Sequence, residues 1–217
     1  AVVSEEFGRP VDDVFRDFSP EPVASASIAQ VHSARMRDGT RVAVKVMRPG
    51  IEQTLRSDIN ILYTLAELLE GQLDLGVTTP SGIVEAFDRA ISQEVDFRIE
   101  ATHAQEFAAA LKGIEGVAVP RVYRQFTTQR VLTLDWVEGT KLSQLATTGA
   151  DVNVVMDRLV EATYQQIFVA GFFHADPHPG NLIVDDDSTL TYLDFGLMGR
   201  ITPEMRDTLE SIFVAVI

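Results

Sequence analysis

The sequence contains no cysteine, and this absence excludes disulfide bonds, thiolate metal sites and cysteine nucleophiles together. Basic residues are also scarce, because 18 Lys and Arg stand against 32 Asp and Glu, which gives a formal net charge of −14 at pH 7. Modules that bind nucleic acid neutralise its phosphates with clustered cations, so we expect no nucleic-acid partner. A nucleotide site needs only a few local cations and a metal ion, so the acidity leaves ATP binding open.

Long apolar runs are missing too. No uninterrupted stretch approaches the roughly 18 residues of a membrane-spanning helix, and the N-terminal residues lack the order of a signal peptide. The length of 217 residues, with 46% hydrophobic and 23% charged residues, suits one domain or two small lobes. An apolar helical pattern opened by Thr202 and Pro203 runs to the last residue. We therefore expect the chain to be a fragment of a larger protein, truncated at its C-terminus.

The most informative stretch carries an Asp and an Asn five residues apart, Asp176 and Asn181, before a short apolar strand at 182–184. A second carboxylate, Asp194, ends another apolar strand and is followed by Phe and Gly. The Asp-x-x-x-x-Asn spacing alone also occurs in surface loops. Together with the strand and Asp-Phe-Gly, it predicts a phosphoryl-transfer site in which Asp176 is the catalytic carboxylate and Asn181 and Asp194 bind Mg²⁺.

Upstream, Asp38 and Gly39 between two β-prone runs predict a hairpin, because glycine tolerates the positive φ of a tight turn. The second strand carries Lys45, which could simply face solvent but matches the lysine with which kinases contact phosphates. An ordinary kinase has a Gly-rich loop just before this hairpin. Here the corresponding residues are Ala24, Ser25, Ala26 and Ser27. Their Cβ atoms narrow the backbone's approach to a phosphate.

The middle of the chain predicts two helical stretches. One runs from Ile51 to near Gly71 or Gly76, and the other is opened by Thr79 and Pro80 and closed by Gly113. The second carries three acidic residues, Glu94, Asp96 and Glu100. On one regular helix Glu94 and Asp96 diverge by roughly 200°, whereas Asp96 and Glu100 share a face. A solvated acidic helix face is the alternative interpretation.

Residues 117–123 and 129–137 predict two strands that complete an antiparallel sheet. After Gly149 an apolar stripe at Val152, Met156, Val160, Tyr164 and Ile167 predicts a helix whose stripe faces the core. His174 and His178 are four residues apart, but two prolines make a helical metal site there unfavourable. We expect His174 to form hydrogen bonds with the loop backbone instead.

Taken together, the chain resembles the UbiB/ADCK family of atypical kinases of coenzyme Q biosynthesis over nearly all of its length. The resemblance rests on the Ala-rich loop running into residues 27–32, on 42–46 and 48–51, on 93–101, on 174–181 and on 194–196. It implies an α+β, two-lobed protein-kinase-like fold. The N-lobe would comprise residues 1–137, with a small antiparallel sheet and inserted helices, and the mainly helical C-lobe would comprise 138–217.

The resemblance also implies a site for ATP or ADP with Mg²⁺. The Ala-rich loop would replace the Gly-rich loop and shift nucleotide preference, Lys45 would contact phosphates and Glu100 would orient Lys45. Glu94 and Asp96 would lie on the nucleotide side. The family's Lys-x-Gly-Gln motif is absent, since residues 141–144 read Lys-Leu-Ser-Gln. The implied role is ATP hydrolysis or phosphoryl transfer in ubiquinone biosynthesis or lipid homeostasis.

The implied partners are an adenine nucleotide and, for the full-length protein, membrane lipid or quinone-biosynthesis proteins. The implied location is cytoplasmic, with the full-length protein peripheral to the inner membrane. No Ala-Pro-Glu element follows residues 194–196, which argues against a docked peptide substrate. Two alternatives stay open. One is a small-molecule phosphotransferase of the aminoglycoside or choline kinase type, and the other is a non-catalytic module whose lipid or protein affinity responds to nucleotide.

Overall fold

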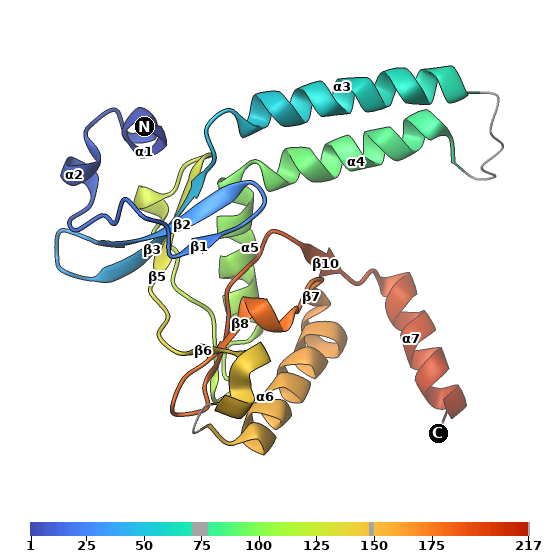
Figure 1. Ribbon diagram of the computed structural model, residues 1–217. Coiled ribbons are helices and arrows are strands. Elements are labelled where there is room, and N and C mark those ends of the chain that lie inside the picture. Colours follow the sequence, from blue (N-terminus) through green and yellow to red (C-terminus); the bar gives the residue numbers. More distant parts are fainter. Residues whose placement is uncertain (71–77, 148–149, 217) are drawn as a thin grey trace. The chain divides into compact units, whose positions relative to one another are not determined.

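The computed structural model describes residues 1–70, 78–147 and 150–216, and its elements are drawn in Figure 1. Internal contacts divide the chain into two compact units, each assembled from two stretches of sequence. Unit 1 comprises Ala1–Ile99 and Tyr123–Thr133, and unit 2 comprises Glu100–Val122 and Leu134–Ile217. The predicted lobes meet at one boundary, after residue 137, and this boundary stays a prediction. The two units differ from it because each combines two separate stretches of the sequence.

Unit 1 is built around a sheet with the strand order β1 (Ala24–Ser25), β2 (Ala29–Arg35), β3 (Arg41–Met47) and β5 (Val131–Asp135). Strands β2 and β3 form the predicted antiparallel hairpin, with Arg35 opposite Arg41. Gly39 in its turn has φ 91°, which a residue without Cβ adopts at no steric cost. The prediction from Asp38 and Gly39 is confirmed.

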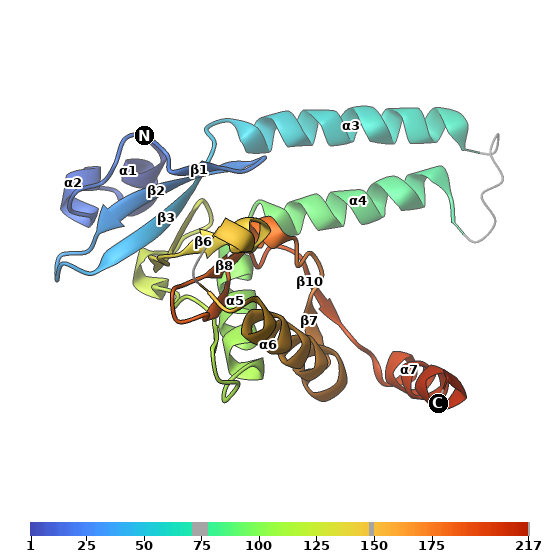
Figure 2. The ribbon, with the colours of Figure 1, turned by 60° about the horizontal axis from the view of Figure 1, so that its bottom comes forward.

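Two short helices, α1 (Val2–Phe7) and α2 (Val11–Val14), lie beside this sheet in both ribbon views (Figures 1 and 2). Val14 at the end of α2 and the following Phe15 pack with Val42 and Val44 of β3 into a buried cluster. Val42, Val44 and Phe15 are completely buried. Side chains alternate between the two faces of a strand, so Val42 and Val44 face the same side. Their packing in the buried cluster holds β3, the strand that carries Lys45, in place.

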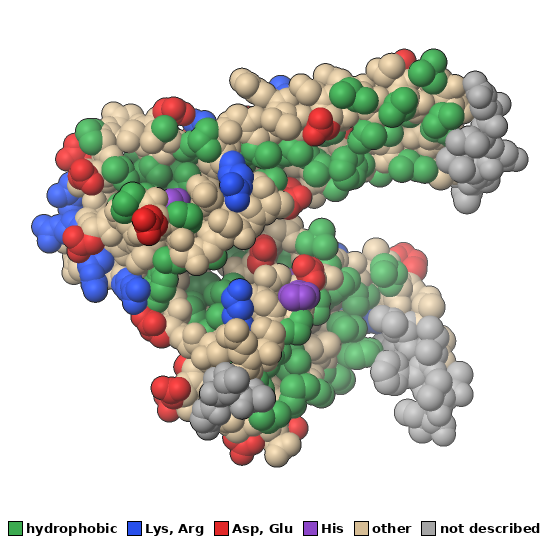
Figure 3. Space-filling view, in the orientation of Figure 1, with side chains coloured by type: hydrophobic (Ala, Val, Ile, Leu, Met, Phe, Trp, Pro, Cys, Tyr) green, Lys and Arg blue, Asp and Glu red, His purple; other side chains and the backbone are tan. Residues whose placement is uncertain are grey.

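Helices α3 (Ile51–Leu69) and α4 (Pro80–Glu94) form a helical pair. The Oγ of Thr79 accepts a hydrogen bond from Gly82 N at 3.0 Å, so the predicted start of α4 is confirmed. Figure 3 shows hydrophobic side chains on the surface of both helices. The large ones that are exposed are Ile61, Leu62, Leu65, Leu68, Leu69, Ile83 and Phe87.

The predicted single helix from residue 80 to 113 is wrong, because the chain breaks at Val95 and Asp96. Helix α4 ends at Glu94, and a new helix, α5, spans Phe97–Ala110. Asp96 Oδ1 accepts a hydrogen bond from the N–H of Arg98 at 3.0 Å, as an N-terminal capping carboxylate does. Asp96 therefore precedes α5 and shares no helix face with Glu100. The cap satisfies an N–H that a continuous helix would have bonded to its own backbone.

Unit 2 contains a second sheet with the order β4 (Val117–Ala118), β9 (Leu190–Tyr192), β8 (Leu182–Val184) and β6 (Thr140–Lys141). Strands β7 (Phe172–His174) and β10 (Met198–Arg200) form a separate antiparallel pair. The helices are α5, α6 (Val152–Tyr164), a π-helical turn η3 (Gln165–Ala170) and α7 (Pro203–Val216). Short 3₁₀ turns span Leu142–Thr147 and Pro179–Asn181, and a further one, in unit 1, spans Arg124–Phe126.

The strand predicted at 117–123 is only partly correct. Its first two residues, Val117 and Ala118, pair in parallel with β9 in the second sheet. Beyond Pro120 the chain turns to β5, which it meets through the antiparallel bridge between Val122 and Leu134. Proline has no N–H to give to a strand ladder, so it ends the first pairing and divides the predicted strand between two neighbours.

The stripe predicted to be the core face of the 152–167 helix is wrong. Val152, Met156, Val160 and Tyr164 are 44–65% exposed. The opposite face is buried instead, and it contains Val155, Ala162 and Gln166. Both faces carry apolar residues at helical spacing, and the buried one is the less obvious because it ends in an amide side chain.

Among the described residues, no helix combines the length and hydropathy needed to cross a membrane.

Candidate functional site

Strands β8 and β9 place two of the predicted metal ligands side by side in unit 2. Leu182 pairs with Tyr192, and one step beyond this pair the N–H of Leu193 donates to the carbonyl of Asn181 at 2.9 Å. Asn181, which precedes β8, and Asp194, which follows β9, therefore lie at the same end of the strand pair. The antiparallel ladder explains why residues 13 positions apart lie together. Both side chains are half-buried, and Asp194 Oδ1 also accepts from Gly196 N at 3.1 Å.

The imidazole of His174 joins Asp176 to Asp194. Its Nδ1 accepts a hydrogen bond from the backbone N–H of Asp176 at 3.2 Å, and its Nε2 bonds the carbonyl of Asp194. A carbonyl only accepts, so Nε2 carries the proton and Nδ1 does not. The expectation that His174 supports the loop backbone is confirmed, and the three predicted residues Asp176, Asn181 and Asp194 lie in one cluster.

The ring of His174 is 5% exposed and packs edge-on or tilted against Phe107, Tyr192 and Phe195. Burial among these apolar rings lowers the pKa of His174, although the carbonyl and carboxylate of Asp194 act in the opposite sense. The neutral ring is therefore favoured at neutral pH, which is the form that both of its hydrogen bonds require. Asp176 itself is exposed, so its carboxylate is accessible to a substrate.

A second histidine, His103 on α5, lies at the same turn. Its Nδ1 bonds the carbonyl of Phe195 at 3.0 Å, and its ring is tilted against Phe172. Sequence reasoning missed this residue, because a lone His in an Ala-rich helix has no motif. It also missed Gln166, which is 4% exposed and bonds the backbone N–H of His174. The only available signal was a polar residue on the less apolar face of the helix predicted at 152–167.

In unit 1, Lys45 lies on β3 opposite Val31, and its ammonium nitrogen is 5.3 Å from the centre of the Phe97 ring. An ammonium over an aromatic face is attracted by the ring quadrupole, so this contact helps to orient the lysine. Glu100 lies in unit 2 on α5 and is 6% exposed. A carboxylate this buried requires hydrogen bonds or an opposite charge to remain ionised.

The Ala-rich stretch forms the exposed tip of the hairpin between β1 and β2. Ala24 pairs with Val31 and Ser25 with Gln30, and the N–H of Ala26 donates to Ala29 O at 2.9 Å. The guanidinium of Arg48 donates to the carbonyl of Ala26 at 3.3 and 3.4 Å. The residues of this stretch, Ala24, Ser25, Ala26 and Ser27, are all exposed. The tip thus presents backbone groups from a position that Arg48 helps to fix.

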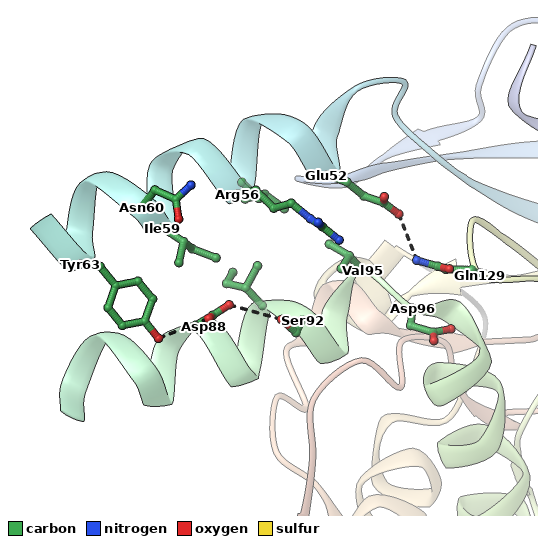
Figure 4. A pocket seen from close by; sticks show the side chains of 12 residues that line it. Glu52, Arg56, Ile59, Asn60, Tyr63, Asp88, Ser92, Val95, Asp96 and Gln129 are labelled. Atoms are coloured by element: carbon green, nitrogen blue, oxygen red, sulfur yellow. Dashed lines mark hydrogen bonds between the residues drawn. The ribbon is translucent and has the colours of Figure 1, made fainter. Parts of the chain in front are cut away.

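The remaining two predicted residues lie at the junction between α4 and α5. Glu94 is exposed at the end of α4. Asp96 is bonded to the Arg98 guanidinium at 2.6 Å, and this hydrogen bond lowers the pKa of the Asp96 carboxyl. Asp96 also lines a cavity of about 490 Å³ between α3 and α4. Figure 4 shows the cavity with Tyr63 and Ser92 both directed at Asp88, which accepts from them at 3.3 and 3.4 Å.

The donor set in unit 2 fits a magnesium ion carried by a nucleotide. Within the parts of the chain that the structure describes, no group of three or more His, Asp or Glu side chains could hold a metal ion alone. Mg²⁺ in nucleotide sites is bound by one or two protein oxygens together with substrate phosphates and water. Asn181 and Asp194 offer such a pair of oxygen ligands, and the chain has no cysteine thiolate that would favour a softer metal.

The family model described as the ABC1 atypical kinase-like domain matches residues 1–217. Protein ACTIVITY OF BC1 COMPLEX KINASE 7 of Arabidopsis thaliana, described as chloroplastic, is 37% identical over 217 residues, which cover 99% of this chain and 31% of that protein. "Probable protein kinase UbiB" of Marinobacter nauticus is 35% identical over 222 residues, covering 99% of this chain and 41% of the relative. The chain thus spans less than half the length of these relatives.

Two solved structures are similar in fold. The complex of Rv3197 with erythromycin from Mycobacterium tuberculosis has a TM-score of 0.80 and 30% sequence identity, covering 95% of this chain and 51% of that one. The Rio2 kinase complex with ADP/Mg²⁺ and phosphoaspartate from Chaetomium thermophilum has a TM-score of 0.52 and 12% identity, covering 97% of this chain and 56% of that one. The predicted α+β kinase-like fold is confirmed.

Proposed function

The chain belongs to the ABC1 atypical kinase-like family, and we propose that it binds ATP or ADP with Mg²⁺ and either hydrolyses ATP or transfers its phosphoryl group. The observation that carries this proposal is the cluster in unit 2. His174 bonds the backbone at Asp176 and at Asp194, and the β8–β9 ladder sets Asn181 beside Asp194. These are the three side chains that phosphoryl transfer requires at fixed separations.

Each residue of the cluster has a distinct task in this proposal. The exposed carboxylate of Asp176 orients the attacking hydroxyl or water and accepts its proton. The amide oxygen of Asn181 and the carboxylate of Asp194 bind the metal ion. Bound Mg²⁺–ATP would supply the phosphoryl group and the metal charge that neutralises it. The bond from Gly196 N to Asp194 Oδ1 restrains the carboxylate rotamer, so its orientation is established before the nucleotide binds.

Residues outside this cluster have further tasks in the proposal. Lys45 contacts the nucleotide phosphates, and Glu100 orients it. The backbone of Ala24, Ser25, Ala26 and Ser27 approaches the phosphates in place of a Gly-rich loop. Glu94 and Asp96 act on the nucleotide side. The position of Lys45 within a packed strand and the exposure of the Ala-rich tip support these assignments.

The name of the Marinobacter nauticus relative supports a role in ubiquinone biosynthesis or lipid homeostasis, with the partners that such a role implies: membrane lipid or quinone-biosynthesis proteins. Because the chain covers 41% of that relative, such a role would belong to a longer protein of which this is the nucleotide-binding part. A cytoplasmic location, peripheral to the inner membrane in the full-length protein, belongs to the same proposal. Other relatives are described as chloroplastic, so location varies among similar proteins.

A second candidate function is the binding of a small organic molecule without phosphoryl transfer. It is favoured by the 30% identity to Rv3197, whose solved structure is a complex with erythromycin. The two candidates differ in one measurable property. Transfer or hydrolysis consumes ATP and depends on Asp176, whereas binding of a small organic molecule neither consumes ATP nor depends on Asp176.

The test of the proposed function is thermal unfolding of the 217-residue chain with ATP or ADP, each with and without Mg²⁺, and measurement of phosphate release. A ligand at about 100 times its Kd adds roughly 2.7 kcal/mol of stability to the folded state. We expect a Mg²⁺-dependent shift that Asp194→Asn abolishes and that the matched change at an exposed turn, Asp186→Asn, leaves intact. Phosphate release lost in Asp176→Asn would assign catalysis. A wild-type chain unaffected by any nucleotide would overturn the proposal.

A further inference from the structure

We infer that Gln166 is a positioning residue that sets the relative placement of Asp176 and Asp194. The inference rests on the proposed function, because it concerns how the nucleotide and metal residues are aligned. Gln166 does not face the cluster directly and touches neither carboxylate in the described contacts. It acts through two residues, His174 and Tyr192, which precede the two carboxylates in the chain by two residues each.

The amide of Gln166 uses both of its ends. Its Oε1 accepts the backbone N–H of His174 at 3.0 Å, and its Nε2 donates to the hydroxyl of Tyr192 at 3.2 Å. The first bond restrains β7 and the second restrains β9. One side chain therefore connects the strand that leads into Asp176 with the strand that leads into Asp194. An amide has an acceptor and a donor about 2 Å apart on one rigid group, so it can make both bonds while uncharged.

Gln166, His174 and Tyr192 are all buried, so the loss of either hydrogen bond is costly. Gln166 is 4% exposed, His174 is 5% exposed and Tyr192 is completely buried. Water cannot replace a lost partner easily at such depth, so a broken bond leaves a polar group unsatisfied. The ring of Tyr192 also packs against Phe107, with 5.0 Å between the ring centres, and against the imidazole of His174. A shift of Tyr192 would consequently be transmitted to the ring of His174, which bonds the backbone at Asp176 and at Asp194.

The local helix geometry explains why a glutamine is available at this place. Gln166 lies in the π-helical turn η3, Gln165–Ala170, which ends at Gly171 with φ 63°. A π turn accommodates an extra residue, so side chains after it are displaced from the face that regular α-helical spacing would give. The neighbouring Gln165 points elsewhere, since its Nε2 bonds the carbonyl of Ala110 at 3.4 Å. Two adjacent glutamines on one turn thus have separate contacts.

This pair of glutamines provides a matched test. In Gln166→Met the side chain keeps its length and lack of branching but loses both hydrogen bonds, and in Gln165→Met the same change is made one residue away. In Tyr192→Phe the hydroxyl that Gln166 bonds is removed while the ring stays. Each variant of the 217-residue chain is to be examined by ¹⁵N NMR of the backbone and the imidazoles and by ATP titration with and without Mg²⁺.

We expect wild type to show His174 protonated at Nε2 only. In Gln166→Met the amide signals of His174, Asp176 and Gly196 move, the imidazole becomes a mixture of tautomers, and the gain in ATP affinity that Mg²⁺ confers falls roughly tenfold or more, since small misplacements have such effects. ATP affinity without Mg²⁺ should change less than about twofold. Tyr192→Phe should give a smaller change of the same kind, and the double variant should be no worse than Gln166→Met alone.

The outcomes separate this inference from the proposed function. If wild type shows no Mg²⁺-dependent nucleotide binding, the proposed function fails, and the NMR signals still decide whether Gln166 sets the His174 tautomer. If wild type binds but Gln166→Met resembles Gln165→Met in every readout, the inference about Gln166 is wrong. Should Gln166→Met not fold, Tyr192→Phe supplies the test, and unchanged Mg²⁺ dependence and NMR signals in that variant would equally overturn it.

Discussion

The imidazole of His103 donates from Nδ1 to the backbone carbonyl of Phe195 at 3.0 Å, while the imidazole of His174 bonds the preceding carbonyl, that of Asp194. Two successive carbonyls are thus bound by histidines from α5 and β7. Both rings use an N–H as donor, although from different nitrogens. This arrangement fixes the backbone on which the proposed metal ligand Asp194 is mounted, and it leads to the first prediction.

Replacing His103 with Phe should loosen the turn at 194–196. The substitution keeps a ring to pack against Phe172 and removes the N–H, so the Phe195 carbonyl loses its partner. We expect a loss of about 1–2 kcal/mol in the free energy of unfolding, the usual cost of leaving a partly buried acceptor unsatisfied. Urea unfolding measures it. Ala108→Gln, on the exposed side of α5, is the control, and equal stability of the two variants would contradict the prediction.

Stability should depend on pH through Glu6, which bonds Arg130 at 2.7 Å. Burial alone raises the pKa of Glu6, but contacts with Thr128 and Arg130 outweigh it and lower the pKa below 4.5. The unfolded chain therefore binds a proton at a higher pH than the folded chain does. The stabilisation is present in full above the unfolded pKa and is lost as the pH falls through the lowered folded value.

The variant Glu6→Gln tests this dependence. At pH 7 we expect it to cost about 1 kcal/mol, as for a partly exposed hydrogen-bonded ion pair. The difference from wild type should shrink as the pH is lowered past 4.5 and vanish in acid. Chemical unfolding at several pH values measures it. A difference that stays constant from pH 7 to acid would show that the ionised carboxylate contributes nothing.

Replacing Ala26 with Gly should change the ratio of ATP to ADP affinities. The Cβ of Ala26 lies at the exposed tip between β1 and β2, where the proposed site presents backbone to phosphate. Glycine restores backbone freedom there, at a folding cost of roughly 0.5–1 kcal/mol. Calorimetric titration with each nucleotide measures the ratio. An unchanged ratio, equal to that of the control Ala108→Gly on α5, would remove the loop from nucleotide selection.

Gly199 should not tolerate a side chain. It pairs with Phe173 across β10 and β7, and a Cβ at Gly199 would overlap the end of the Phe173 ring. We expect Gly199→Ala to destabilise the chain by about 1–3 kcal/mol, as overpacking does. A second change, Phe173→Leu, removes the overlap and should recover part of the loss. If the two changes simply add, the clash is not the cause.

Much of the site could be predicted because local chemistry determines it. The hairpin follows from Asp38 and Gly39, the cap of α4 from Thr79, and the neighbouring positions of Asn181 and Asp194 from two short strands joined by a polar turn. Each of these signals depends on residues close in sequence. The resemblance then supplied the order in which the pieces meet, and the family match confirms the resemblance.

The errors share a different cause, which is competition between similar local patterns. Asp96 reads as one more acidic residue on a long helix, yet its carboxylate caps a new one. Pro120 divides what looks like one strand between two sheets. On α6 two faces carry apolar residues, and only tertiary packing selects the face that ends in Gln166. The roles of His103 and Gln166 could not be predicted either, because their hydrogen-bond partners lie 92 and 8 residues away in the sequence.

The interleaved composition of the two units bears on how the chain is made. Unit 1 needs Tyr123–Thr133, and the first stretch of unit 2, Glu100–Val122, leaves the ribosome before that segment does. Strand β5 (Val131–Asp135), which supplies an edge of the first sheet, begins within Tyr123–Thr133. Until residues 131–135 are synthesised, β3 therefore has an unpaired edge. Unpaired edges of this kind invite association between chains, so the protein depends during synthesis on the rapid arrival of residues 123–133.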